Sequence, residues 1–207
     1  MNIHGALAII LALLALEFKI IQKDMFVAIL MLVLITSTTS GGLIRRILGR
    51  KKPVRFIQFL SPKAFSESLD ATDKFQAIWE LASIACENTG LEPDTVVDIA
   101  WANEMAISST TFNGVVILYA GCDNLNESIV AVGISQNGVI FNSHGDHKAK
   151  IIFLVITPKM DEHVKREIIE DINETFRSPD FAEIARQARN FTEFLALIKS
   201  RKGFENK

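Results

Sequence analysis

The sequence predicts two transmembrane α-helices followed by an α/β domain whose mixed sheet is flanked by helices. Three observations predict this organisation. Residues 1–60 hold eight basic and two acidic side chains, a net charge of +6, so residues 61–207 carry −8 of the total charge of −2. Residues 25–44 form an uncharged run, long enough to cross a hydrocarbon core of roughly 30 Å. The rest of the chain has the pattern of helices, then strands, then helices.

Composition and charge disfavour two classes of protein. A uniformly soluble globule is disfavoured by the long apolar run. Nucleic-acid binding is disfavoured because the folded part is acidic and the basic side chains adjoin an apolar segment. Cys86 and Cys122 lie far apart, outside any CxxC or Cys/His spacing, so we expect two buried free thiols rather than a disulfide or a zinc site.

The two predicted membrane spans cover about residues 3–21 and 25–44, and the chain turns around Lys23-Asp24. Glu17 and Lys19 would lie near the membrane interface. A cleaved signal peptide is the competing interpretation. However, no basic region precedes the first apolar run, and a second apolar run follows it.

A basic cluster follows the second span. It consists of Arg45, Arg46, Arg50, Lys51, Lys52 and Arg55. By the positive-inside rule, we expect residues after about 45 to lie in the cytoplasm of a bacterial cell, with the spans in the inner (cytoplasmic) membrane. Membrane lipid is therefore an expected partner, and the cluster could also hold anionic headgroups.

The predicted membrane hairpin resembles the last two helices of the Kef-type monovalent cation:proton antiporter family. Its sequence is HGALAIILALLALEFKIIQKDMFVAILMLVLITSTTSGGLIRRIL, and the similarity covers residues 3–50. It rests on a short acidic-flanked loop, a Thr/Ser-rich end of the last helix and an Arg-rich exit. His4-Gly5 stands where the family has Arg-Gly. The family's ion-binding residues lie on earlier helices, so none is carried over. The resemblance implies a C-terminal piece of an antiporter or a split gene product, with other antiporter helices or subunits as partners.

The cytosolic part begins with a predicted linker over residues 53–65, and the domain proper is expected over residues 66–202. A helix opens near residues 70–73, because the apolar residues that follow recur at helical spacing: Phe75, Ile78, Leu81, Ala82 and Ala85. A second helix starts at Glu92-Pro93-Asp94, since proline suits the first helical turn.

Four apolar segments then predict strands. They cover residues 114–119, 128–134, 139–141 and 150–157. Asn137-Gly138 is a hairpin signal between the second and third strands. Pro158 ends the fourth strand, and helices are predicted over residues 160–176, 180–188 and 190–199. This order predicts a mainly buried sheet with helices packed against it.

The order of elements resembles the enzyme IIA domain of the fructose/mannitol/nitrogen type (type 2) from the phosphoenolpyruvate sugar phosphotransferase system. The family pattern has Arg-Glu at a helix end, a Ser/Thr-rich turn, an acceptor histidine after a proline, and a second histidine at the start of a late helix. The corresponding segments here are SSTTFNG at 108–114, VVILYA at 115–120 and IIFLVITPKMDEHVKREI at 151–168. The resemblance places five residues in a phosphotransfer pocket: Asn103, Glu104, Thr110, Tyr119 and His163.

Departures from the family pattern decide the expected chemistry. Tyr119 occupies the acceptor position, Leu118 replaces the proline, and Asn103 replaces the arginine that would steady a phosphohistidine. A phosphoryl relay needs a neutral imidazole nitrogen as nucleophile and a cation for the dianion, and a protonated phenol is a poor substitute. We therefore interpret the pocket as vestigial, with no catalytic residue, and we expect the domain not to be an enzyme.

The other histidines have simpler interpretations. His144 and His147 lie in NSHGDHK, without a third ligand at metal spacing, and are expected in a surface loop rather than a metal site. His163 is expected to be a solvated residue in the first turn of a helix, although it could still line the vestigial pocket.

Taken together, the sequence predicts the C-terminal part of a membrane cation:proton antiporter with a cytosolic, phosphotransfer-silent IIA-like regulatory domain. The alternative is a stand-alone, membrane-tethered component of the phosphotransferase system or a protein-docking module. We expect the domain to bind a regulatory protein or a small ligand, and no nucleic acid.

Overall fold

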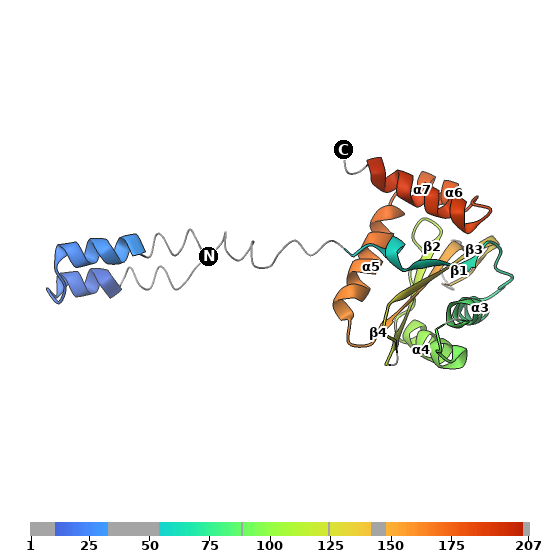
Figure 1. Cartoon of the computed structure of the whole chain (residues 1–207), viewed down its shortest axis with the longest axis horizontal. Helices are drawn as coiled ribbons and strands as arrows, with labels where there is room; N and C mark the ends of the chain where they lie inside the picture. The colour runs from blue at the N-terminus through green and yellow to red at the C-terminus, as the bar shows by residue number, and fades with distance from the viewer. Residues whose placement is uncertain (1–10, 33–53, 88, 124, 142–147, 205–207) are drawn as a thin grey trace. The chain divides into compact units, whose positions relative to one another are not determined.

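The chain divides into two compact units, Met1–Pro53 and Val54–Lys207. The computed structural model describes residues 11–32, 54–87, 89–123, 125–141 and 148–204, with residues 202–204 described by their backbone (Figure 1).

In the first unit, residues 11–17 and 23–32 are helical and residues 18–21 form the turn between them. The predicted spans 3–21 and 25–44 lie partly outside the described residues. Where described, the first helix ends before the predicted boundary, because Lys19 takes a left-handed backbone with φ of 56°. No helix among the described residues combines the length and apolar character needed to cross a membrane. Of the basic cluster, only Arg55 lies within the described residues.

The second unit is a mixed α/β domain, as the sequence predicts. Its elements are η1 (Phe56–Phe59), β1 (Leu60–Ser66), α3 (Lys74–Cys86), α4 (Pro93–Ala106), β2 (Val115–Cys122), β3 (Ile129–Val139), β4 (Ala149–Pro158), α5 (Glu162–Thr175), α6 (Pro179–Ala185) and α7 (Phe191–Phe204). The four strands form one sheet in the order β1-β3-β4-β2. β1 runs parallel to β3, β3 antiparallel to β4, and β4 parallel to β2.

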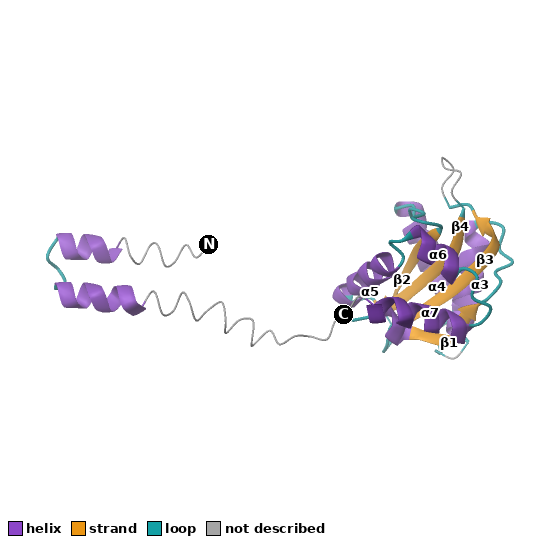
Figure 2. Ribbon diagram, turned by 90° about the horizontal axis from the view of Figure 1, so that it is seen from above, coloured by secondary structure: helices purple, strands orange, loops and turns teal. Residues whose placement is uncertain are grey.

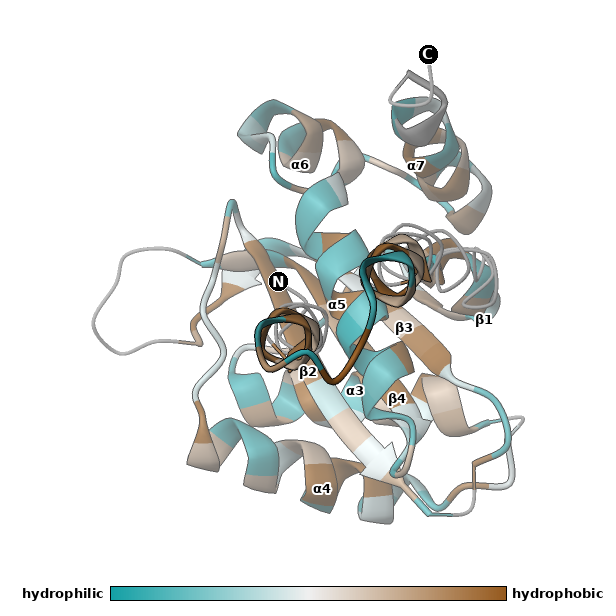
Figure 3. Ribbon diagram, turned by 90° about the vertical axis from the view of Figure 1, so that its left-hand side faces the viewer, coloured by the Kyte–Doolittle hydropathy of each residue, from teal (hydrophilic) through white to brown (hydrophobic). Residues whose placement is uncertain are grey.

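Helices cover both faces of this sheet (Figures 1 and 2). On one face, Ile152, Leu154 and Ile156 of β4 pack in a core with α3 and α4. On the other face, the alternate residues Ile151, Phe153 and Val155 pack in a second core with α5, α6 and α7. Both faces of β4 are buried, so its residues from Ile151 to Ile156 are all apolar instead of alternating with polar residues. Figure 3 shows the contrast between the hydrophobic strands and the hydrophilic exposed side of α5.

The helix starts agree with the sequence signals. Asp73 precedes α3, and its carboxylate accepts a hydrogen bond from the Gln76 backbone N–H at 2.9 Å. Pro93 is the first residue of α4, where its missing N–H has no helical partner to lose.

The segment predicted as a linker over residues 53–65 is instead part of the domain. Phe56 is fully buried, and its ring lies 5.9 Å from that of Phe153 in an edge-to-face pair. Two carboxylates of α5 hold the backbone here: Glu167 accepts from Val54 N–H at 3.2 Å and Asp171 from Phe56 N–H at 3.0 Å. The segment then continues as β1, and its proline is tolerated because β1 is an edge strand with an irregular register between Leu60 and Phe65.

The predicted hairpin at Asn137-Gly138 is also corrected. These two residues lie within β3, which runs on to Val139 and pairs there with Ala149 of β4. The register shifts between Ile134 and Val139, and Gly138 has a φ of 71°. Glycine therefore supplies the left-handed backbone for an irregularity inside one strand rather than for a turn between two strands.

Both cysteines are buried and free, which confirms the prediction of two buried thiols. Cys86 and Cys122 belong to the core between α3, α4 and the sheet. Burial raises the pKa of each thiol, and the neighbouring Cys122 raises that of Cys86 further. A raised pKa keeps the thiols protonated, which makes them unreactive.

Replacing Phe56 by alanine is expected to lower the free energy of unfolding by about 3–5 kcal/mol, because a fully buried aromatic ring leaves a cavity against Phe153. Urea unfolding followed by fluorescence measures this, since both tryptophans, Trp79 and Trp101, lie in the second unit. The control is Met160→Ala, at a side chain that is 94% exposed, with an expected change within about 0.5 kcal/mol. Equal effects of the two substitutions would contradict the inclusion of η1 in the domain.

Candidate functional site

Tyr119 lies on β2, and three elements contact it. Asn103 of α4 donates its side-chain amide to the Tyr119 backbone carbonyl at 3.0 Å. Thr157 of β4 donates its hydroxyl to the phenol oxygen at 3.4 Å. Two of the residues that the sequence assigns to the pocket, Asn103 and Tyr119, are therefore in direct contact.

A lysine covers the ring of Tyr119. The Lys165 ammonium, from the first turn of α5, lies 4.4 Å from the ring centroid, a cation–π distance. Glu162, also on α5, lies 2.6 Å from the same ammonium and fixes it over the ring. The phenol also rests against the backbone of Gly121, where an added Cβ would come within 2.6 Å of the phenol oxygen. The Tyr119 side chain therefore occupies the space over Gly121 on its own strand, β2.

Glu104, the residue after Asn103, is almost completely buried at 2% exposure. One carboxylate oxygen accepts from the Ser109 backbone N–H at 2.9 Å. The other accepts from the Ser108 hydroxyl at 3.1 Å and lies 3.5 Å from the Lys74 ammonium. A buried carboxylate with these partners holds the turn after α4 against α3, so the contacts of Glu104 are structural.

The remaining two predicted pocket residues do not join Tyr119 through a hydrogen bond. Thr110 is exposed on the turn between α4 and β2. His163 lies in the first turn of α5, with 56% of its side chain exposed, and its Nδ1 lies 3.2 Å from a carboxylate oxygen of Glu167 on the same helix. Lys165 rather than His163 covers the ring of Tyr119.

Sequence reasoning missed Lys165, Thr157 and Gly121. Gly121 pairs directly with Thr157 across the parallel β2–β4 ladder, which brings the ends of these two strands and the start of α5 together. The sequence carries no signal for this pairing, because β3 lies between β2 and β4 along the chain. Among the described residues, no group of three or more His, Cys, Asp or Glu side chains is placed to hold a metal ion. His144 and His147 lie outside the described residues.

Comparison with known families gives a match over most of the second unit. The family model of the phosphoenolpyruvate-dependent sugar phosphotransferase system, EIIA 2, matches residues 58–201. The chain belongs to this family. The match includes β1, in agreement with the structure and not with the linker that the sequence suggested.

Solved structures show the same EIIA fold. The nitrogen regulatory protein IIA-Ntr from Neisseria meningitidis has a TM-score of 0.64 at 15% identity, covering 69% of this chain and 97% of that one. IIA mannitol from Escherichia coli has a TM-score of 0.58 at 16% identity, covering 67% and 97%. The complex of enzyme IIAMtl with phosphorylated enzyme IIBMtl from Escherichia coli gives 0.58 at 16% identity, covering 68% and 96%. These likenesses show the fold alone. Comparison with curated proteins gives no match.

The groups that contact Tyr119 in this EIIA domain are an amide, a hydroxyl and an ammonium. These groups can hold a side chain in place by hydrogen bonding and by cation–π attraction. General base catalysis at pH 7 would need a group that accepts a proton from the phenol, and none of the three is suited to that role.

Replacing Glu104 by alanine is expected to lower the free energy of unfolding by about 2–4 kcal/mol, because the Ser109 N–H and the Lys74 ammonium lose their acceptor. Glu104→Gln is expected to cost less, since an amide oxygen still accepts a hydrogen bond. Urea unfolding of the full chain measures both.

The matched control for this experiment is Asp123→Ala. Asp123 pairs with Lys159 at 3.6 Å, but both side chains are more than half exposed. The loss of this surface pair should change the free energy of unfolding by less than about 0.5 kcal/mol. A Glu104→Ala effect as small as that of Asp123→Ala would show that Glu104 does not hold the turn.

Proposed function

We propose that the EIIA domain is a phosphotransfer-silent regulatory domain that serves a membrane cation:proton antiporter of the Kef type. The silent assignment is carried by the contacts of Tyr119, the residue that the family resemblance aligns with the acceptor position. Its hydroxyl accepts from Thr157 and its ring lies under the Lys165 ammonium. A protonated phenol held in this way is a poor nucleophile towards a phosphoryl donor at pH 7. Asn103 stands where the family has an arginine, and its amide donates to the Tyr119 backbone carbonyl. An uncharged amide does not supply the positive charge that a phosphoryl dianion needs.

The antiporter assignment is supported by the sequence of residues 3–50, which resembles the last two helices of Kef-type antiporters. The basic cluster from Arg45 to Arg55 supports an orientation in which residues after about 45 are cytoplasmic, with the spans in the inner membrane. In this arrangement the EIIA domain is tethered at the membrane surface, next to other antiporter helices or subunits. A protein or small ligand bound to the domain would then bias transport.

A second candidate is a stand-alone, membrane-tethered phosphotransferase component or docking module. Exposed apolar side chains on and next to α3 and α4, called the apolar surface, favour protein docking. They are Phe75 and Trp79 of α3, Met105 of α4 and Ile107 just after α4, whose exposed fractions are 45%, 50%, 63% and 82%. Phe75 stacks edge-to-face on Trp101 at 5.2 Å, which joins the two helices. Aromatic and methionine side chains are enriched in protein interfaces.

The charge around this surface indicates the kind of partner it would take. Residues 74–106 contain one basic side chain, Lys74, against six acidic ones: Glu80, Glu87, Glu92, Asp94, Asp98 and Glu104. A partner with an apolar patch bordered by Lys and Arg would be complementary to it.

The silent assignment predicts that the full chain takes up no acid-labile label when it is incubated with labelled phosphoenolpyruvate and the general phosphotransfer proteins. A IIA protein with its acceptor histidine is the positive control. Labelling of the variant Tyr119→His tests whether an imidazole at this position is sufficient for the domain to accept a phosphoryl group. Label on the unmodified chain that disappears in His163→Gln would contradict the silent assignment and support the phosphotransferase alternative.

The regulatory assignment predicts a change in cation-dependent proton flux in vesicles when residues 61–207 are deleted from a complex of this chain with its neighbouring membrane helices. Because a deletion also removes packing, the point variant Trp79→Glu provides a second test on the apolar surface. Met160→Glu, which places the same charge on an exposed side chain away from α3 and α4, is its control. Unchanged rate and ion dependence after the deletion would refute the regulatory role.

A further inference from the structure

A cavity of about 420 Å³ lies at the opposite end of the parallel strands β2 and β4 from Tyr119. It opens where these strands begin, at Gly114 and Lys150, and α6 closes it with Ala182, Glu183 and Arg186. Its volume is within the range of small-molecule sites, about 300–1,000 Å³. None of its lining residues contacts Tyr119, so the cavity is separate from the vestigial phosphotransfer pocket.

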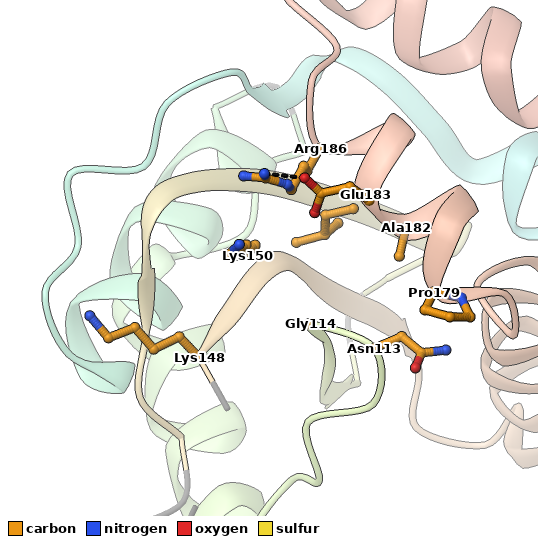
Figure 4. A pocket seen from close by; sticks show the side chains of 9 residues that line it. Asn113, Gly114, Lys148, Lys150, Pro179, Ala182, Glu183 and Arg186 are labelled. Carbon is orange, nitrogen blue, oxygen red and sulfur yellow. Dashed lines mark hydrogen bonds and ion pairs between the residues drawn. The ribbon is translucent and has the colours of Figure 1, made fainter. Parts of the chain in front are cut away.

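The cavity carries excess positive charge. Lys148, Lys150 and Arg186 line it, against one carboxylate, Glu183. The ammonium of Lys148 donates to the Asn137 carbonyl at 3.3 Å and points away from the other cations (Figure 4). Figure 4 shows Lys150 beside the Glu183–Arg186 pair. Lys150 and Arg186 are therefore the two cations available to a ligand.

Both cations lower the pKa of Glu183. Arg186 donates to its carboxylate through Nη2, and this hydrogen bond holds the pKa of Glu183 below its usual value, with the charge of Lys150 adding to the effect. The pairing uses one nitrogen of the guanidinium. Arg186 Nε is buried without a hydrogen-bond partner. The carboxylate of Glu183 therefore neutralises only part of the positive charge of Lys150 and Arg186, and it does not accept from every N–H of the guanidinium.

The walls of the cavity are fixed by backbone contacts. The Gly114 carbonyl accepts from the N–H groups of Lys150 and Ile151 at 2.7 and 3.0 Å. The Asn113 side chain donates to the carbonyls of Phe176 and Arg177 at 3.1 and 3.0 Å, which ties the start of β2 to the end of α5. The cavity is therefore built from strand ends and a helix, not from a loose surface loop.

We propose that this cavity binds a small organic anion, with a phosphate or carboxylate group held between Lys150 and Arg186 and the organic part against Ile151 and Ala182. Arginine and lysine beside an apolar wall suit such a ligand, because oxyanions form charge-assisted hydrogen bonds with both side chains. The volume is larger than a bare ion needs, which favours an anion with a carbon skeleton. This site is independent of whether Tyr119 accepts phosphate.

The test is a titration of the ¹⁵N-labelled full chain at low salt with three probes: inorganic phosphate, glycerol 3-phosphate and succinate. We expect amide shifts confined to the cavity, at Gly114, Ile151 and Ala182, with an organic probe binding more tightly than inorganic phosphate. Lys150→Met should weaken the binding roughly tenfold, as should Arg186→Met, since each removes one charged donor. Added salt should also weaken it.

Lys159→Met is the matched control, because Lys159 lies just beyond the other end of β4, is exposed and pairs with Asp123. It should leave the affinity unchanged. Because Arg186 caps the end of α6, the amide spectrum of each unliganded variant serves as the test of folding, and Lys150→Met carries the conclusion if α6 changes. No cavity shifts with any probe up to about 20 mM, or equal affinities of Lys150→Met and Lys159→Met, would overturn the proposal.

Discussion

The burial of β4 on both faces is the constraint on which the rest of the domain depends. All residues from Ile151 to Thr157 are buried, and those from Ile151 to Ile156 alternate between two cores. One strand can satisfy two cores only if helices cover both sides of the sheet, and this is the role of α3 and α4 on one face and α5 to α7 on the other. The backbone groups of β4 are satisfied by β2 and β3 on either side.

The pairing of β4 with β2 also determines where polar chemistry can occur. Parallel strands end at the same edge, so Tyr119, Thr157 and the first turn of α5 meet there. Ligand sites in open α/β sheets commonly lie at this carboxyl edge. In this chain the edge holds a phenol under a lysine, and the acidic residue of the neighbouring motif, Glu104, is committed to the turn after α4. The contacts of Tyr119 and Glu104 therefore join β2, β4, α4 and α5 and hold the turn after α4.

The opposite end of the parallel β2–β4 pair, where the two strands begin, carries more positive than negative side chains. There the start of β4 brings Lys150 close to Glu183 and Arg186 of the α6 region, around a cavity that the carboxyl edge does not share. The two ends belong to one ladder of eight residue pairs, so the contacts of Tyr119 and the cavity lie at opposite ends of the same two strands.

The sequence by itself determined the existence and type of most elements. The Asp73 cap, Pro93 at a helix start and the apolar run of β4 act locally, and the structure places them where the sequence indicates. The family resemblance also placed Asn103 and Tyr119 in one pocket, and the structure brings these two residues into contact. Local signals failed at two places. Residues 53–65 looked like a linker and Asn137-Gly138 looked like a turn, because the sequence shows which backbone angles a residue favours but not which strand lies beside it.

Tertiary structure alone decided the strand order, and with it the composition of both sites. Lys165 and Thr157 meet Tyr119 because β4 crosses to the far side of β3 and pairs with β2, a contact between segments about forty residues apart. Lys150 at the start of β4 and Arg186 at the end of α6 line one cavity because α6 packs on the face of the sheet that includes Ile151. Pairing of this kind depends on the burial of whole faces rather than on local propensity. The sequence therefore predicts most of the elements, and only packing reveals which side chains surround Tyr119.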